Sequence, residues 1–192
     1  MNGPLRRGGR YLDPSGRPVS WSVAEGGRGR RWRWTISDRL GGLVASHTLE
    51  AGPDGRFSKL ESASRTGLLT LHREPDGSVH GNRLTEIGVD HLTIEAPVPD
   101  LAIVGGGGFG IAPFMAGFLR DRGSEPKGRV EVDVIEVFDD LGVRVISCTV
   151  HGGGGEWQVR TNLATRRMVL GADGLPADEV GDGVSWPLER VP

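Results

Sequence analysis

The sequence predicts an all-β protein with one short helix, folded as a strongly curved antiparallel sheet or an incomplete β-barrel of about 10–12 strands. Three observations support this fold class. Runs with a period of two recur along the chain, turn signals separate them about every 8–15 residues, and glycine is frequent, at 32 of 192 residues. Since a sheet of this many strands does not stay flat and open, we expect it to curl, split or close.

The first half of the chain is expected to be a series of hairpins. Residues 1–18 hold Gly, Pro and Arg without periodicity, which predicts a flexible N-terminal arm before a single β domain over residues 19–192. Residues 31–36 alternate strictly and place Trp32 and Trp34 on one face. Asp76-Gly77 between two alternating runs predicts a hairpin. We expect strands at residues 21–23, 31–36, 43–49, 57–63, 67–72, 79–85 and 91–96.

The second half contains the helix and the remaining strands. Residues 111–120 place apolar side chains, including Phe114, on one helical face, and Pro113 suits the first turn. Residues 129–137 alternate and then slip in phase, which indicates a bulge or burial on both faces. We expect further strands at residues 143–150, 157–161, 168–170 and 184–188.

Charge and cysteine content argue against several classes of protein. The net charge is −2, without the basic domain that nucleic-acid binding requires, so we expect no nucleic-acid partner. Cys148 is the only cysteine, which rules out an intrachain disulfide and favours a reducing compartment. The N-terminus lacks the apolar core of a secretory signal, and residues 101–119 are too rich in glycine to span a membrane stably. We therefore expect a cytoplasmic protein.

Residues 105–110 contain GxGxxG, a motif of dinucleotide-binding loops, at Gly105, Gly107 and Gly110. The segment looks like the phosphate loop of ferredoxin-reductase-type nicotinamide domains, so a nucleotide- or flavin-dependent oxidoreductase is one alternative. The rest of the chain does not alternate strand and helix. The acidic residue expected about 20 positions on for ribose binding is also poorly matched, since Asp121 and Glu125 lie too early or in the loop and Asp133 lies within an expected strand. We therefore favour a structural turn or lid and expect no cofactor.

Catalytic and metal-binding patterns are sparse. His72, His80 and His91 fall on consecutive expected strands, where they would meet if those strands are neighbours, and a metal-dependent hydrolase is a second alternative. No HxH or HxxxH spacing occurs, so we expect no metal. The chain has no GxSxG elbow, and Cys148 lies within an expected strand, where a buried and inert thiol is the default. We therefore expect no catalytic residues.

The chain resembles a family of bacterial proteins described as glycolipid-binding. The resemblance runs from the Trp32 region through Leu49, continues through SRTGLLTLHREPDGSVHGNRLTEIGVDHL, and ends in LGADGLPADEV at residues 170–180. The resemblance covers about two thirds of the chain. It implies a curved, partly closed antiparallel sheet that binds a lipid-like ligand, and it implies no catalytic residues. The family's central cysteine-bearing block has no counterpart here, where residues 101–119 stand instead.

We therefore expect non-catalytic binding of a lipid-like or glycolipid-like amphipathic molecule in the concave face of the sheet. The indole rings would supply an apolar wall, the imidazoles and the Asn82 amide a polar rim, and residues 105–118 a lid. The expected ligand-binding residues are Trp32, Trp34, His72, His80, Asn82, His91, Phe114 and Trp157. Arg31 and Arg33 are expected to form a solvated face, with binding of an anionic headgroup as their alternative role. A structural or interaction module without a small ligand is the remaining alternative.

Overall fold

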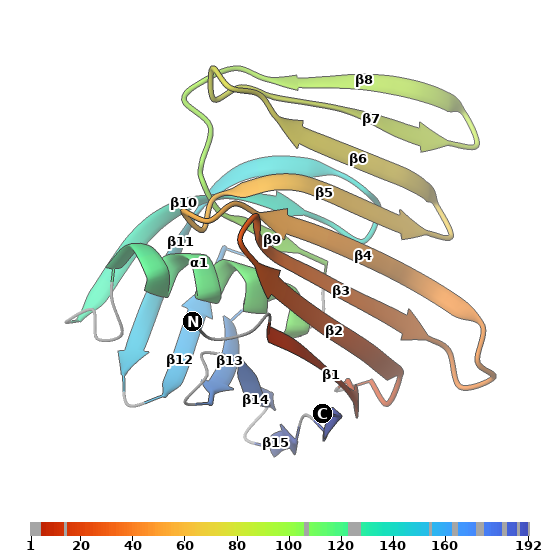
Figure 1. Cartoon of the computed structure of the whole chain (residues 1–192). Helices are drawn as coiled ribbons and strands as arrows, with labels where there is room; N and C mark the ends of the chain where they lie inside the picture. Colours follow the sequence, from red (N-terminus) through yellow and green to blue (C-terminus); the bar gives the residue numbers. More distant parts are fainter. Residues whose placement is uncertain are drawn as a thin grey trace.

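The computed structural model describes residues 5–13, 15–105, 108–122, 128–153, 155–162, 165–171, 175–181, 184–187 and 189–191. Within these residues the chain is mostly strand with one short α-helix, which confirms the all-β class (Figure 1). The strands divide between two sheets. One has the order β16-β1-β2-β3-β4-β5-β6-β7-β8, and the other has the order β15-β14-β13-β12-β11-β10-β9.

The first sheet is a strongly curved antiparallel sheet of consecutive hairpins (Figure 1). Its Asp76-Gly77 hairpin closes as predicted. Gly77 has a φ of 88°, and its N–H donates to the Glu74 carbonyl at 3.0 Å. The strands are β1 (Leu5–Leu12), β2 (Pro18–Gly26), β3 (Gly29–Ser37), β4 (Leu43–Ala51), β5 (Phe57–Ser64), β6 (Gly67–Arg73), β7 (Val79–Thr85), β8 (Gly88–Ile94) and β16 (Glu189–Val191).

The expectation of a flexible arm over residues 1–18 was wrong for residues 5–12, which form β1. This strand pairs with β2 from Leu5↔Glu25 to Leu12↔Pro18, and its other edge pairs with β16. Tyr11 is buried, so β1 contributes to the core. The adjacent Gly8 and Gly9 interrupt the alternation of side chains, which explains why the sequence pattern did not reveal the strand. Residues 1–4 and 14 lie outside the described residues.

The second sheet contains the only parallel pair among the described strands, between β9 and β10. Its strands are β9 (Ala102–Val104), β10 (Arg129–Val137), β11 (Val143–Gly153), β12 (Glu156–Arg160), β13 (Thr165–Leu170), β14 (Pro176–Gly181) and β15 (Val184–Pro187). β10 pairs with β11 in one continuous register, while all residues from Val134 to Val137 are buried. The predicted phase slip in β10 therefore reflects burial on both faces and not a bulge.

A short helical segment occupies the space between the two sheets (Figure 1). It consists of the 3₁₀ turn η1 (Gly108–Ile111) and the helix α1 (Ala112–Arg122). The Phe109 ring lies 5.3–6.5 Å from the rings of Trp21, Trp32, Trp34 and Tyr11, at the inner face of the first sheet. Phe118 packs against Trp157 of the second sheet, and their ring centroids are 6.4 Å apart. One hydrophobic cluster therefore joins both sheets. No helix among the described residues is long and apolar enough to cross a membrane.

Replacing Phe109 with alanine should lower the free energy of unfolding by about 3–5 kcal/mol, because the ring is buried at the centre of the aromatic cluster. Urea denaturation followed by tryptophan fluorescence measures this change. Leu40→Ala is the matched control, since Leu40 is 97% exposed and should change stability by less than about 0.5 kcal/mol. Equal effects of the two substitutions would contradict the central packing role of Phe109.

Candidate functional site

The four aromatic residues expected to line a ligand cavity belong to the hydrophobic core. Trp32, Trp34, Phe114 and Trp157 are each at most 3% exposed. Trp32 and Trp34 contact Phe109, while Phe114 stacks on Phe118 at 5.9 Å. The inner face of the curved sheet is thus covered by side chains of η1 and α1. These rings are held by other side chains of the same chain.

The four polar residues expected at a rim lie together, but on the outer face of the first sheet. His72 is directly opposite His80, and Asn82 is directly opposite His91. His91 Nδ1 lies 2.6 Å from Asn82 Oδ1, and all four side chains are exposed. The strands β6, β7 and β8 are neighbours, which brings the polar residues together, but the sheet separates these residues from the indole rings. Among the described residues, no group of three His, Cys, Asp or Glu side chains is arranged to hold a metal ion.

The glycine-rich loop leads into a strand–helix–strand unit of the kind that the nucleotide alternative predicts, since α1 connects the parallel strands β9 and β10. The N-terminal end of the helix in this unit is buried, however. Ile111 and Ala112 are at most 1% exposed, and a Cβ at Gly110 would lie 1.8 Å from the Val104 carbonyl oxygen. A phosphate site needs accessible N–H groups at the helix N-terminus. The described part of the loop serves packing, and Gly106 and Gly107 lie outside the described residues.

A serine–histidine pair lies inside the protein, where sequence analysis did not place a site. Ser62 Oγ is 2.8 Å from His47 Nδ1, and the His47 ring packs on Trp34 at 4.9 Å. Both side chains are at most 3% exposed, so the hydroxyl is out of reach of a substrate. Burial lowers the pKa of His47 to about 4, although the charge of Asp139 opposes the shift. Cys148 is also buried, and burial raises the pKa of its thiol to about 12, as expected for an inert cysteine.

The candidate site is a groove on the outer face of β1, β2 and β3, which we call the arginine groove. It is lined by Arg6, Arg7, Gly8, Ser22, Val23, Ala24, Arg31 and Arg33 and has a volume of about 380 Å³. The register explains its shape. Arg6, Ala24 and Arg31 lie side by side, as do Gly8, Ser22 and Arg33. The small residues of β2 therefore form a floor between arginines on the two flanking strands.

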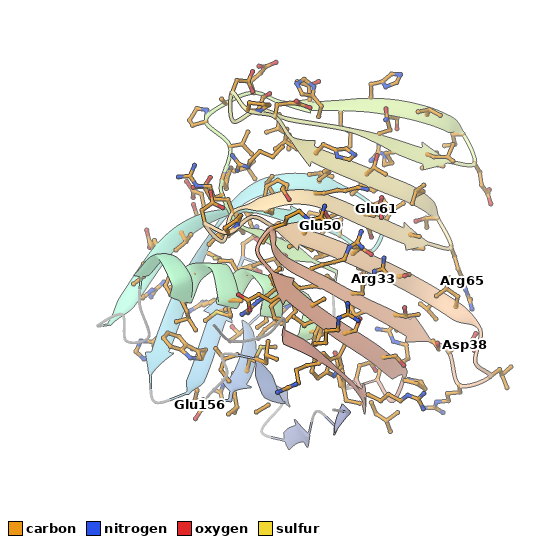
Figure 2. All side chains as sticks on the ribbon, viewed as in Figure 1. Arg33, Asp38, Glu50, Glu61, Arg65 and Glu156 are labelled. Atoms are coloured by element: carbon orange, nitrogen blue, oxygen red, sulfur yellow. The ribbon has the colours of Figure 1, made fainter. Side chains whose placement is uncertain are left out.

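The arginine groove carries positive charge that the described residues do not fully neutralise. Arg31 Nη2 lies 2.5 Å from Glu50 Oε1. Among the described residues, neither Arg6 nor Arg33 forms an ion pair with a carboxylate. Figure 2 shows Arg33, Glu50 and Glu61 on β3, β4 and β5, and the strand register places them on the same outer face. The two unpaired guanidinium groups make the groove attractive to an anion.

A second cavity continues the arginine groove toward the β2–β3 turn. It has a volume of about 800 Å³ and shares Arg6, Ala24 and Arg31 with the groove. Arg28 and Arg30 also line it, and Arg30 pairs with Glu25 at 2.5 Å. Basic side chains therefore extend over both cavities, in a chain whose net charge is −2.

Part of this site could be predicted from the sequence. Arg31 and Arg33 were expected to form a solvated face of their strand, with binding of an anionic headgroup as their alternative role. Arg6 was missed because residues 1–18 were assigned to an arm. The sequence pattern that could have indicated the groove is the alternation of small side chains at Ser20, Ser22 and Ala24, which gives the outer face of β2 only short side chains.

Comparisons with known proteins support the fold alone. No protein-family model matches the chain, and no curated protein matches it. The chain is similar to a solved structure described as a DUF1089 family protein from Pseudomonas aeruginosa, with a TM-score of 0.57 and 14% sequence identity. The match covers 85% of this chain and 89% of that one.

The lowered pKa of His47 predicts a loss of stability in acid. An unfolded histidine ionises near pH 6.5 and the buried one only near pH 4, so the unfolded state binds more protons between these values. The free energy of unfolding should therefore fall by roughly 3 kcal/mol as the pH decreases from about 6.5 to about 4. Urea denaturation at several pH values, for the native chain and His47→Gln, measures this difference. Parallel pH profiles for the two chains would contradict it.

Proposed function

We propose that the protein binds an amphipathic, lipid-like molecule without catalysing a reaction, and that the arginine groove holds an anionic headgroup of this ligand. The observation that carries the proposal is the pair Arg6 and Arg33, which have no carboxylate partner among the described residues and flank a floor of small side chains. The resemblance of the sequence to a glycolipid-binding family favours an amphiphile.

The geometry of the groove suits a phosphate or sulfate group. Neighbouring strands lie about 4.8 Å apart, so β1 and β3 are separated by about 10 Å across β2. Long arginine side chains on both strands can therefore converge on one group above Gly8 and Ser22. A guanidinium group offers a planar fork of donors that matches two oxygens of such an anion, and it remains charged at every physiological pH.

The groove also explains how an amphiphile would lie. Arg6, Arg31 and Arg33 are exposed, so the groove is open and receives a headgroup without enclosing an acyl chain. The aliphatic stems of the arginines and the Ala24 methyl group offer apolar surface next to the charges. A ligand in the inner face of the sheet would instead have to displace Phe109 and α1. We therefore place the ligand on the outer face.

The double variant Arg6→Gln/Arg33→Gln should bind dihexanoyl phosphatidic acid at least about tenfold more weakly than the native chain, because each lost charge-assisted hydrogen bond contributes about 1.5–3 kcal/mol. Isothermal titration calorimetry below the micelle concentration measures the dissociation constants. Binding to the native chain should also weaken as NaCl is raised from about 50 to about 300 mM.

Arg65→Gln is the matched control, since Arg65 is an exposed arginine at the β5–β6 turn, where it pairs with Asp38 at 2.9 Å (Figure 2). It should bind like the native chain. Dihexanoyl phosphatidylcholine, whose headgroup has no net charge, should bind weakly to all variants. Equal binding of the two lipids to the native chain, or an undiminished affinity in the double variant, would contradict the proposed headgroup site.

A further inference from the structure

The four edges of the two sheets differ in length. The edge strands β9 and β16 have three residues each and β15 has four, whereas β8 has seven. β8 pairs with β7 over its full length without a register shift, and no other described strand pairs with its outer edge. Short edge strands resist pairing with another chain, while a long regular one invites it. Among the described edges, β8 is therefore the one able to accept another strand.

The side chains of β8 lack the features that protect an edge strand. It contains neither lysine nor proline. Its one charged residue, Asp90, pairs with Arg83 of β7 at 2.8 Å and is thereby neutralised within the hairpin. Val89 is 56% exposed, and it ends a row of exposed aliphatic side chains that begins with Leu68 and Leu84. Apolar surface thus reaches the open edge.

We propose that β8 pairs antiparallel with β8 of a second copy of this chain, about a two-fold axis at His91. His91 is the central residue of Gly88–Ile94, so this register leaves no residue of the strand unpaired. It places Val89 opposite Thr93 of the second copy and Asp90 opposite Leu92 of that copy. No two carboxylates are then directly opposite, and Val89 and Thr93 are both β-branched residues that favour strands.

Self-pairing suits β8 better than pairing with an unrelated peptide, because an antiparallel copy of β8 matches it in length and places no like charges opposite one another. A closed two-fold dimer needs a surface complementary to its own copy. On the outer face, both His91 rings meet at the axis, and each is held by Asn82 of its own hairpin at 2.6 Å. On the inner face, Gly88 leaves room for Ile94 of the second copy. Because one strand pair buries less than a standard interface, we expect association at micromolar concentrations.

Analytical ultracentrifugation between about 5 and 500 µM tests this proposal. The native chain should shift with concentration from its 20.5 kDa monomer toward twice that mass. Val89→Lys/Thr93→Lys places lysine opposite lysine at both ends of the strand pair and should raise the dimer dissociation constant at least about tenfold. Val89→Lys/Thr93→Glu places lysine opposite glutamate and should keep it within about threefold of the native value.

Leu40→Lys controls for the added charge, since Leu40 lies in the β3–β4 turn and is also highly exposed, and it should leave dimerisation unchanged. Far-UV circular dichroism checks that each variant is folded. A native chain that stays monomeric at every concentration would overturn the proposal. A similar loss of dimer in both double variants would also overturn it, because the assigned register requires the opposite-charge variant to pair.

Discussion

The architecture depends on the packing of Phe109 and α1 into the curve of the first sheet. Each sheet has one apolar face, and neither face could remain in water without a large free-energy cost. The segment between β9 and β10 supplies the missing middle layer, with Phe109 against the tryptophans of one sheet and Phe118 against Trp157 of the other. At Gly117 the helix packs so closely that a Cβ would lie 2.9 Å from the Gly55 carbonyl oxygen. Filling the interior in this way leaves the exterior for recognition.

Local patterns in the sequence predicted the elements well. The strict alternation at residues 31–36 correctly placed Trp32 and Trp34 on the buried face of β3, and Asp76-Gly77 correctly predicted a hairpin. The division into two sheets could not be predicted, because strands of both sheets show the same period of two. β1 was missed for a related reason. It is fixed by pairing with β2 and with the distant β16, while Gly8 and Gly9 mask its alternation.

The candidate site illustrates a different limit. Leu71 is buried in β6, so the next residue, His72, must lie on the opposite face of the sheet. Applying this parity to every strand would have separated the imidazoles from the indoles. The sequence hypothesis combined both sets in one cavity because it required a polar rim and an apolar wall together. The arginine groove could be found only in part, since Arg6 reaches Arg31 and Arg33 only through the β1–β2–β3 register.

The pairing of β1 with β16 has a consequence for the order in which the protein is made. Gly8 pairs with Val191, so residues near the two ends of the sequence share one ladder. During synthesis the hairpins from β1 to β8 can form as they leave the ribosome, because each contacts its predecessor. The free edge of β1, which itself carries Arg6, stays open until β16 emerges. A nascent chain would therefore present an unpaired edge of β1 from the synthesis of β1 until that of β16, and chaperones could cover this edge in the interval.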